Sequence, residues 1–237
     1  MAEALLAATG IVRSFPGSRA VQAVRGVSLS LAPRDFVALM GPSGSGKTTF
    51  VGVLSGLDAP DEGQVLWKGQ PIHRRSRQER RELRRSGMGI VFQSFGLLPT
   101  LSAAENVELP LRVAGVDLTE ARDRAASWLE RLGLADRADN RTFELSAGQQ
   151  QRVAVARALI AEPEVVLADE PIAEVDTENA DLILEALWDV IGRGGAVLAA
   201  THNSEVLRYA NRVVLFRDGQ VDREGPPQEL AAHLTAD

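Results

Sequence analysis

Apolar and polar residues alternate, and then run continuously, in the first third of the chain. Two apolar segments, residues 21–31 and 36–40, are bounded by proline and glycine and predict β-strands. A glycine-rich loop follows the second segment, residues 48–56 can form a helix, and residues 64–67 predict a further short strand. The first third of the sequence is therefore expected to be rich in β-structure.

The hydrophobic period changes in the middle of the chain. Residues 88–93 predict a short strand, whereas the apolar positions of residues 102–132 recur at helical spacing, so we expect that whole segment to be helical. Residues 74–85 contain seven arginines and two glutamates. Such a run is typical of a solvated helix or loop face, and a patch for nucleic acid or membrane is the alternative.

Continuous apolar runs return in the last third, at residues 165–168, 196–200 and 213–216, with helical segments between them. This alternation is typical of a parallel sheet covered by helices. The sequence therefore predicts one α/β domain, residues 1–237, into which a helical subdomain of about residues 94–162 is inserted.

Composition and charge narrow the class of protein. Acidic residues outnumber basic ones by 32 to 26, and the formal charge of −6 gives no general attraction to nucleic acid. Cysteine is absent, which excludes disulfides, thiolate metal sites and a cysteine nucleophile. We find no secretory signal pattern and no apolar run near the roughly 20 residues that cross a bilayer, so we expect a cytoplasmic, non-spanning protein without a nucleic-acid partner.

The first candidate site is the loop at residues 41–48, Gly-Pro-Ser-Gly-Ser-Gly-Lys-Thr, which fits the pattern G-x-x-x-x-G-K-[ST] between a strand and a helix. Glycines let the backbone approach a phosphate closely, and backbone N–H groups at a helix start supply partial positive charge. The lysine can reach the β- and γ-phosphates, and the threonine hydroxyl can bind Mg²⁺. The predicted nucleotide contacts in this loop are Gly41, Ser43, Gly44, Gly46, Lys47, Thr48 and Thr49.

The second candidate site is a pair of carboxylates, Asp169 and Glu170, directly after the apolar run 165–168. An aspartate at the end of a strand can hold Mg²⁺, and a glutamate beside it can orient and polarise a water molecule. Alone, adjacent acids would only indicate a helix start, but the phosphate-binding loop favours the chemical roles. The separation of the two sites along the chain allows their strands to be neighbours in the sheet.

Residues 145–152, Leu-Ser-Ala-Gly-Gln-Gln-Gln-Arg, resemble the signature L-S-G-G-Q and the basic helix of the ATP-binding cassette (ABC) ATPases. Four more residues resemble motifs of that family in the family's order: Phe15 the aromatic that stacks on adenine, Gln93 the Q-loop glutamine, Asp176 the D-loop aspartate and His202 the switch histidine. The resemblance covers nearly the whole chain. It implies a P-loop NTPase core with an amino-terminal antiparallel β portion and an inserted α-helical subdomain.

The resemblance also implies ATP and Mg²⁺ as ligands and a role for each matching residue. The expected catalytic residues are Lys47, Glu170 and His202. The expected Mg²⁺ ligands are Thr48, Gln93 and Asp169. The expected nucleotide contacts outside the loop are Phe15, Ser146, Gly148 and Gln149.

The signature has a physical interpretation of its own. Ser146 and the N–H groups that follow it open a helix, which makes a second anion site on the same chain. One phosphate chain cannot easily meet both sites, so we expect each nucleotide to lie between the loop of one subunit and the signature of another. The resemblance therefore implies a dimer, most simply a homodimer, that closes on two ATP and drives a separate ABC membrane subunit from the cytoplasmic face of the membrane.

Three departures from the family pattern stand out. Ala147 replaces the usual first glycine, which is mild if this position is helical, because alanine is the better helix former. Phe15 replaces the more usual tyrosine and keeps the π-face without the hydroxyl. The D-loop departs most, with Ile172, Glu174 and Val175 in place of a threonine, a small or polar residue and a leucine. The D-loop therefore follows the family pattern less closely than the phosphate-binding loop does.

Within the family, residues 56–63, 95–107 and 167–171 are similar to the lipoprotein-releasing and macrolide-exporter type of ATPase subunit. This similarity implies export or extraction of a lipid-linked, peptide or drug-like substrate. In the family, the segment at 95–107 forms the groove for a helix of the membrane subunit. Its leucines, at positions 97, 98 and 101, are interpreted as exposed groove residues, with ordinary core packing as the alternative.

Other functions remain open at this point. A cassette ATPase that acts on DNA or the ribosome would usually carry two cassettes or a long insertion, for which 237 residues leave no room. An uptake-type subunit for small solutes would share the same motifs. A non-catalytic, nucleotide-sensing module is disfavoured by Glu170 and His202.

Overall fold

The computed structural model describes residues 3–16 and 21–234, with side chains up to residue 230. The first half contains β1 (Leu6–Phe15), β2 (Val21–Leu31), β3 (Phe36–Met40), α1 (Lys47–Leu54), β4 (Glu62–Trp67), β5 (Gln70–Pro71), α2 (Arg77–Ser86), β6 (Met88–Val91) and α3 (Ala103–Val113). The second half contains α4 (Leu118–Arg131), η1 (Ala135–Arg137), η2 (Thr142–Glu144), α5 (Ala147–Leu159), β7 (Val165–Asp169), α6 (Thr177–Gly192), β8 (Ala196–Thr201), η3 (Ser204–Arg208), β9 (Arg212–Arg217), β10 (Gln220–Gly225) and α7 (Pro227–Leu234).

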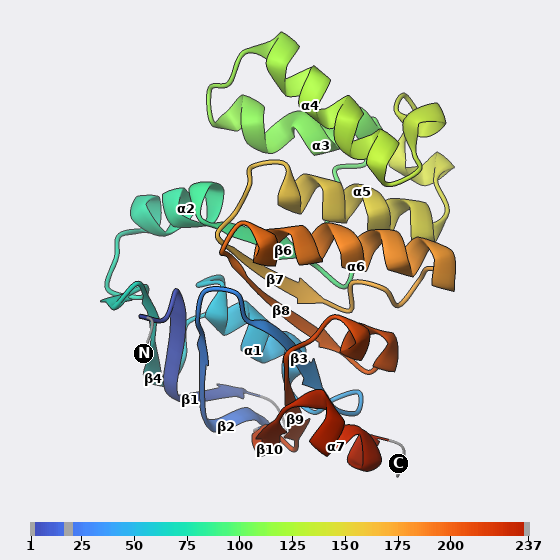
Figure 1. Ribbon diagram of the computed structural model, residues 1–237. Helices are drawn as coiled ribbons and strands as arrows, with labels where there is room; N and C mark the ends of the chain where they lie inside the picture. The colour runs from blue at the N-terminus through green and yellow to red at the C-terminus, as the bar shows by residue number, and fades with distance from the viewer. Residues whose placement is uncertain (1–2, 17–20, 235–237) are drawn as a thin grey trace.

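The strands form two sheets (Figure 1). An antiparallel sheet has the order β2-β1-β4-β5, and its strands β1 and β2 mix buried and exposed positions because only one face is covered. The larger sheet has the order β10-β9-β3-β8-β7-β6 and is parallel except for β10, which returns beside β9. Every residue of β3, β7 and β8 is buried, as expected for strands covered on both faces.

Side chains of β3 alternate between two hydrophobic cores. Val37 and Leu39 belong to a core shared with α1 and the antiparallel sheet, whereas Phe36, Ala38 and Met40 belong to a core shared with α3, α5 and α6. Helices α3, α4 and α5 pack together, as Figure 1 shows. Among the helices in the described part of the chain, none is both long and apolar enough to cross a membrane.

The helical prediction for residues 102–132 needs a correction. The chain forms two helices there, and the break between α3 and α4 contains Gly115 with a φ of 84°. Glycine adopts this left-handed backbone without a Cβ penalty. A new helix then starts because Asp117 accepts hydrogen bonds from two backbone N–H groups of the first turn of α4.

The two strands that carry the motifs, β3 and β7, could be neighbours by their separation along the chain, but they are not adjacent in the sheet. Strand β8 lies between β3 and β7. The two motifs nevertheless meet, because α1 starts directly after the glycine-rich loop and packs against β7 and β8. The loop thus reaches the end of β7 through its helix and not through adjacent strands.

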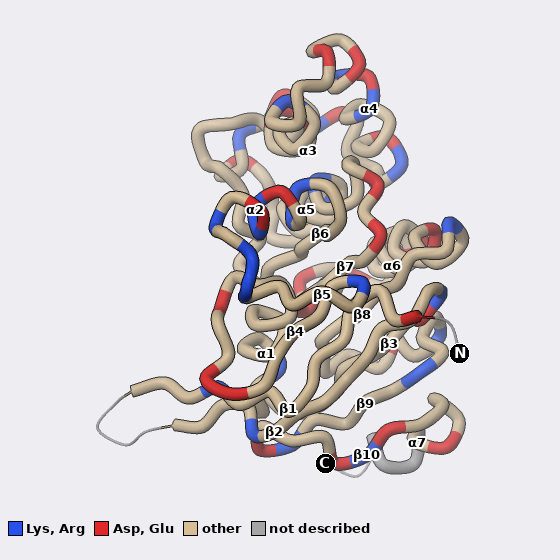
Figure 2. The backbone as a smooth tube through the Cα atoms, turned by 90° about the vertical axis from the view of Figure 1, so that its left-hand side faces the viewer, with Lys and Arg blue, Asp and Glu red and all other residues tan. Residues whose placement is uncertain are grey.

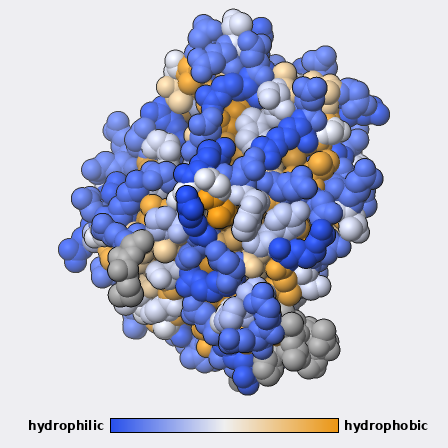
Figure 3. All heavy atoms as spheres, in the orientation of Figure 1, coloured by the Kyte–Doolittle hydropathy of each residue, from blue (hydrophilic) through white to orange (hydrophobic). Residues whose placement is uncertain are grey.

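The arginine-rich segment forms α2, whose charged residues are visible in Figure 2. Ser76 and Glu79 close a capping box at its start, and Leu83 is its one buried residue. The helix therefore has the solvated face that the sequence predicts. Figure 3 shows the same polar character more widely, since polar residues cover most of the visible face and apolar residues occupy small areas between them.

Candidate active site

The glycine-rich loop is held between the backbones of β2 and β9. A Cβ added at Gly46 would lie 2.1 Å from the carbonyl oxygen of Ala23, and one at Gly41 would lie 2.0 Å from that of Phe216. Gly46 also has a φ of 104°, which other residues rarely adopt. These two glycines are therefore required by close packing, while Ser43 between them is exposed on the open side of the loop.

Lys47 connects the loop with the carboxylates. It is the first residue of α1 and is 7% exposed. Its Nζ donates to the carbonyl oxygens of Gly41, at 2.6 Å, and Pro42, at 3.0 Å. Burial lowers the pKa of Lys47, and the nearby charges of Glu170 and Asp169 act in the opposite direction. The ammonium group thus lies between the loop and the end of β7.

Asp169 ends β7 and is 4% exposed. A hydrogen bond from Thr48 reaches its side chain, whereas its Oδ1 has no hydrogen-bond partner in the described part of the chain. Burial raises the pKa of this carboxyl group, and the Thr48 hydrogen bond opposes that shift. A buried carboxylate oxygen without a partner, beside a threonine hydroxyl, fits the oxygen ligands that Mg²⁺ prefers.

Glu170 follows directly, and both of its carboxylate oxygens have partners, one in the last residue of β8 and one in the residue after it. Its Oε2 accepts a hydrogen bond from Thr201 Oγ1 at 2.8 Å, and its Oε1 lies 2.8 Å from His202 Nδ1. Glu170 has a φ of 50°, and its N–H donates to Ala200 O at 2.7 Å. The glutamate and the histidine of the sequence prediction therefore come together, and their adjacent strands β7 and β8 place them.

Gln93 and Phe15 flank this centre. Gln93 is exposed two residues after β6, the strand that pairs with β7, so it lies at the same carboxyl edge of the sheet as Asp169. Phe15 ends β1 and is 40% exposed, with the Arg13 guanidinium 4.9 Å from its ring centre. Phe15 pairs with Val21 on β2, the strand whose Ala23 carbonyl oxygen lies against Gly46 of the loop.

The signature starts α5 on the other face of the large sheet from α1. Ser146 caps the helix: its Oγ accepts from the Gln149 N–H at 3.3 Å, and its own N–H donates to Gln149 Oε1 at 2.9 Å. The side chain of Gln149, which the sequence predicts to contact the nucleotide, therefore takes part in the helix cap. Ala147 is the first residue of the helix, so its replacement of glycine is compatible with the fold.

The signature and the D-loop contact each other. A Cβ added at Gly148 would lie 2.7 Å from the carbonyl oxygen of Glu174. Ile172, the largest departure in chemistry from the family pattern, is 1% exposed and fills the core beside α6. Asp176 accepts from the Asn179 N–H at 2.9 Å and starts α6. The core thus accommodates Ile172, whereas Glu174 is exposed, and Gly148 is needed for the close approach to the Glu174 backbone.

Two residues of the site were not predicted from the sequence. Thr201 is fully buried and contacts Glu170, and Arg157 of α5 donates to the carbonyl oxygens of Phe95, at 2.8 Å, and Gly96, at 2.6 Å. Arg157 therefore ties the segment after Gln93 to the signature helix. A threonine next to the switch histidine and an arginine on the signature helix were the available signals.

The fold and the arrangement of the loop, the carboxylates and the signature define a P-loop ATPase of the cassette type. Residues 24–173 match the model of the family described as "ABC transporter". The chain belongs to this family, and the predicted ABC ATPase fold is confirmed.

Named relatives agree with this assignment. The chain is 39% identical over 228 residues to the macrolide export ATP-binding/permease protein MacB of Wolinella succinogenes, which covers 96% of this chain and 36% of MacB. It is 43% identical over 206 residues to an uncharacterized ABC transporter ATP-binding protein of Thermotoga maritima, which covers 87% of this chain and 88% of the relative. The chain thus spans about a third of the length of the export proteins that it matches.

A solved structure is also similar. The dimeric ATP-binding cassette MJ0796, in a post-hydrolysis state bound to ADP and Pi, shares 35% sequence identity and a TM-score of 0.89. The match covers 93% of this chain and 98% of the cassette. The whole cassette fold is therefore shared at substantial sequence identity.

Proposed function

We propose that the chain is the ATP-hydrolysing subunit of an ABC transporter, which dimerises around two ATP and drives a separate membrane subunit at the cytoplasmic face of the membrane. The observation that carries this proposal is the convergence of Lys47, Asp169, Glu170 and His202 at one edge of the large sheet. Phosphate release from ATP by the purified chain, with and without Mg²⁺, tests the hydrolytic part.

In this proposal, the loop binds the phosphates of ATP and Phe15 stacks on the adenine. Backbone N–H groups of the loop and the start of α1 face the phosphates, and Lys47 exchanges its carbonyl partners for β- and γ-phosphate oxygens. The π-face of Phe15 opposite Arg13 is the one available to a base.

Thr48, Asp169 and Gln93 would hold Mg²⁺. No cluster of three or more His, Asp or Glu side chains exists among the described residues, so the ion would take its remaining ligands from phosphate oxygens and water. When bound, Mg²⁺ neutralises charge on the β- and γ-phosphates.

Glu170 orients the attacking water and accepts its proton, while His202 supports the γ-phosphate. Since the Glu170 carboxylate only accepts hydrogen bonds, the Nδ1 of His202 carries the hydrogen between them. The other ring nitrogen, Nε2, is then directed away from Glu170, and it donates to a γ-phosphate oxygen when the ring carries a hydrogen on both nitrogens.

The signature of each subunit would complete the site of the other, which a mixture of two inactive variants tests. Ser146→Arg blocks the signature and Lys47→Ala disables the loop, so one composite site per heterodimer stays intact. We expect each variant alone to be nearly inactive and the mixture to regain measurable phosphate release. If a mixture that is shown to contain heterodimers stays as inactive as either variant, the sites are not shared between subunits.

Export is the direction that the relatives support. MacB is named a macrolide exporter and PvdT of Pseudomonas aeruginosa a pyoverdine exporter, at 39% and 40% identity to this chain. We propose a lipid-linked, peptide or drug-like substrate on this basis.

Three experiments separate this function from its alternatives. Co-purification with a membrane protein favours the transporter, and co-sedimentation with ribosomes or DNA favours the soluble alternative. Substrate accumulation in cells distinguishes uptake from export.

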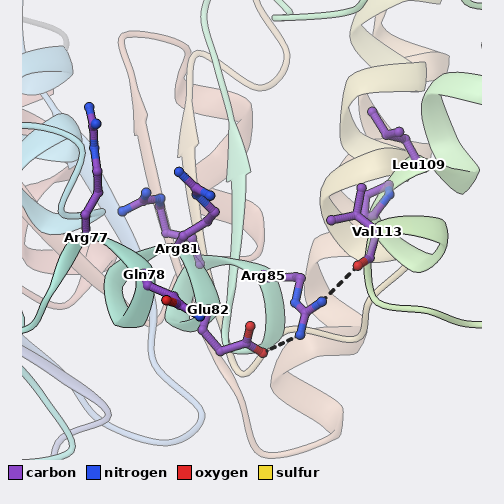
Figure 4. Close-up of a pocket in the computed structure, with 9 residues that line it drawn as sticks. Arg77, Gln78, Arg81, Glu82, Arg85, Leu109 and Val113 are labelled. Carbon is purple, nitrogen blue, oxygen red and sulfur yellow. Dashed lines mark hydrogen bonds and ion pairs between the residues drawn. The ribbon is translucent and has the colours of Figure 1, made fainter.

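The membrane subunit is proposed to dock on the groove between α2 and α3 (Figure 4), which has a volume of about 660 Å³. Its apolar lining comes from Leu109, Pro110 and Val113 of α3, and Arg85 of α2 donates to the carbonyl oxygen of Val113 at 2.8 Å. The three leucines predicted for this role are not among the residues that line this groove: Leu98 is 44% exposed, and those at 97 and 101 are half-buried.

The docking proposal predicts that charge on the apolar lining of the groove breaks the association. Leu109→Asp combined with Val113→Asp should leave ATP binding unchanged and abolish co-purification of the membrane partner from detergent-solubilised membranes. Leu118→Asp, at an exposed leucine outside the groove, is the control and should still co-purify. Normal co-purification of the double variant would place the docking surface elsewhere.

A further inference from the structure

Thr201 lies between the sheet and the catalytic centre. It is the last residue of β8 and is fully buried. Its Oγ1 donates to Glu170 Oε2 at 2.8 Å and accepts from the backbone N–H of Asn203 at 3.0 Å. A carboxylate and an N–H group are compatible with only one direction of the hydroxyl hydrogen, so this hydrogen points at Glu170.

The two oxygens of Glu170 have different surroundings. Oε2 is bound by the buried hydroxyl of Thr201, whereas Oε1 contacts His202, whose side chain is 63% exposed. The Glu170 backbone is fixed as well, because its N–H donates to Ala200 O at 2.7 Å. Strand β8 therefore anchors Glu170 at its backbone and at Oε2, and leaves Oε1 on the side of the site that faces outward.

We propose that Thr201 is a positioning residue for ATP hydrolysis, whose hydroxyl holds Oε2 so that Oε1 faces the attacking water. The proposal rests on the proposed function, in which Glu170 accepts the proton of that water. The water oxygen bonds to the γ-phosphorus, the bond from this phosphorus to the β–γ bridging oxygen breaks, and ADP leaves with the electron pair. The proton goes to Oε1 of Glu170.

A carboxylate free to rotate would present its acceptor oxygen in the wrong direction for part of the time. Misplacement of a reacting group by about 1 Å can cost on the order of 100-fold in rate. Thr201→Val keeps the branched shape and removes the hydroxyl. We expect its turnover to fall about 10- to 100-fold, with ATP affinity and KM nearly unchanged, since Thr201 contacts the water-activating group and not the phosphate loop.

Three comparisons separate positioning from a merely structural role. Thr201→Ser retains the hydroxyl and should recover most of the turnover. Ser55→Ala removes another buried hydroxyl, which donates to Gly52 O at 2.9 Å at the far end of α1, and should hydrolyse ATP normally. In the Glu170→Gln background, adding Thr201→Val should slow hydrolysis no further, because Thr201 acts through the carboxylate that is already lost.

The experiment measures steady-state phosphate release, fluorescent ATP-analogue binding and circular dichroism for each variant. Thr201→Ala takes the place of Thr201→Val if the valine variant does not fold. Normal turnover of a folded variant that lacks the hydroxyl would overturn the proposal. A further loss of turnover in the double variant would also overturn it, because Thr201 would then act independently of Glu170. Near-normal turnover of Glu170→Gln alone would instead contradict the proposed function.

Discussion

Glu170→Gln is expected to keep the affinity of the chain for ATP and to lose about 10²- to 10⁴-fold in turnover. Glutamine has nearly the same shape and its amide oxygen can still accept the Thr201 hydrogen bond. It cannot accept a proton from water. ATP with Mg²⁺ should therefore remain bound, and the dimer should accumulate instead of separating after hydrolysis.

Phosphate release and size-exclusion chromatography with ATP and Mg²⁺ measure these two effects. Glu164→Gln is a suitable control, because Glu164 directly precedes the other end of β7, is exposed, and pairs through its carboxylate with Lys68 at the surface. Surface pairs of this kind contribute about 0–1 kcal/mol. A Glu170→Gln variant that hydrolyses ATP like the control would move the catalytic role to another residue, and one that stays monomeric would count against the dimer.

The order of helices and strands could be predicted from the sequence wherever the hydrophobic period and the positions of glycine and proline agree. The buried runs that became β3, β7 and β8 are continuous because helices or a second sheet cover both faces. The order of these strands in the sheet was not predictable, because it depends on how α1 packs across the sheet. The placement of β8 between the two motif strands therefore depends on tertiary packing.

The segment after Gln93 shows a second limit of sequence reasoning. Leu97 and Leu98 are neighbours of the same type, yet Leu97 packs against the core and Leu98 is exposed. The direction of each side chain is set by the backbone, which Asn106 fixes through hydrogen bonds with the N–H and the carbonyl oxygen of Leu98. No hydrophobic period exists in such an irregular segment, so burial could not be predicted there.

The sequence motifs predicted which positions require glycine, but they did not always predict the physical reason. Gly148 matches the signature, where close approach to a phosphate would explain a glycine. The structure adds a constraint within the same chain, because the carbonyl oxygen of Glu174 occupies the space of a side chain at this position. Thr201 belongs to no motif that the sequence indicated. Its role becomes evident only from the structure, in which its buried hydroxyl contacts Glu170.

The two lysines of the sequence, Lys47 and Lys68, provide a matched pair for the last prediction. All other residues in the count of lysines and arginines are arginines, so these two positions alone carry the compact, flexible charge of an ammonium group. Lys47→Ala should weaken ATP binding by about 10- to 150-fold, because a charge-assisted hydrogen bond contributes roughly 1.5–3 kcal/mol.

Two separate losses contribute to that effect. The ammonium contacts to the phosphates disappear, and the carbonyl oxygens of Gly41 and Pro42 lose the donor that holds the loop in shape. Lys68→Ala should bind ATP like the parent, because Lys68 is half-exposed and pairs with Glu164 at the protein surface. Titration of both variants with a fluorescent ATP analogue decides the matter: equal affinities would mean that the phosphates of ATP do not bind at residues 41–48.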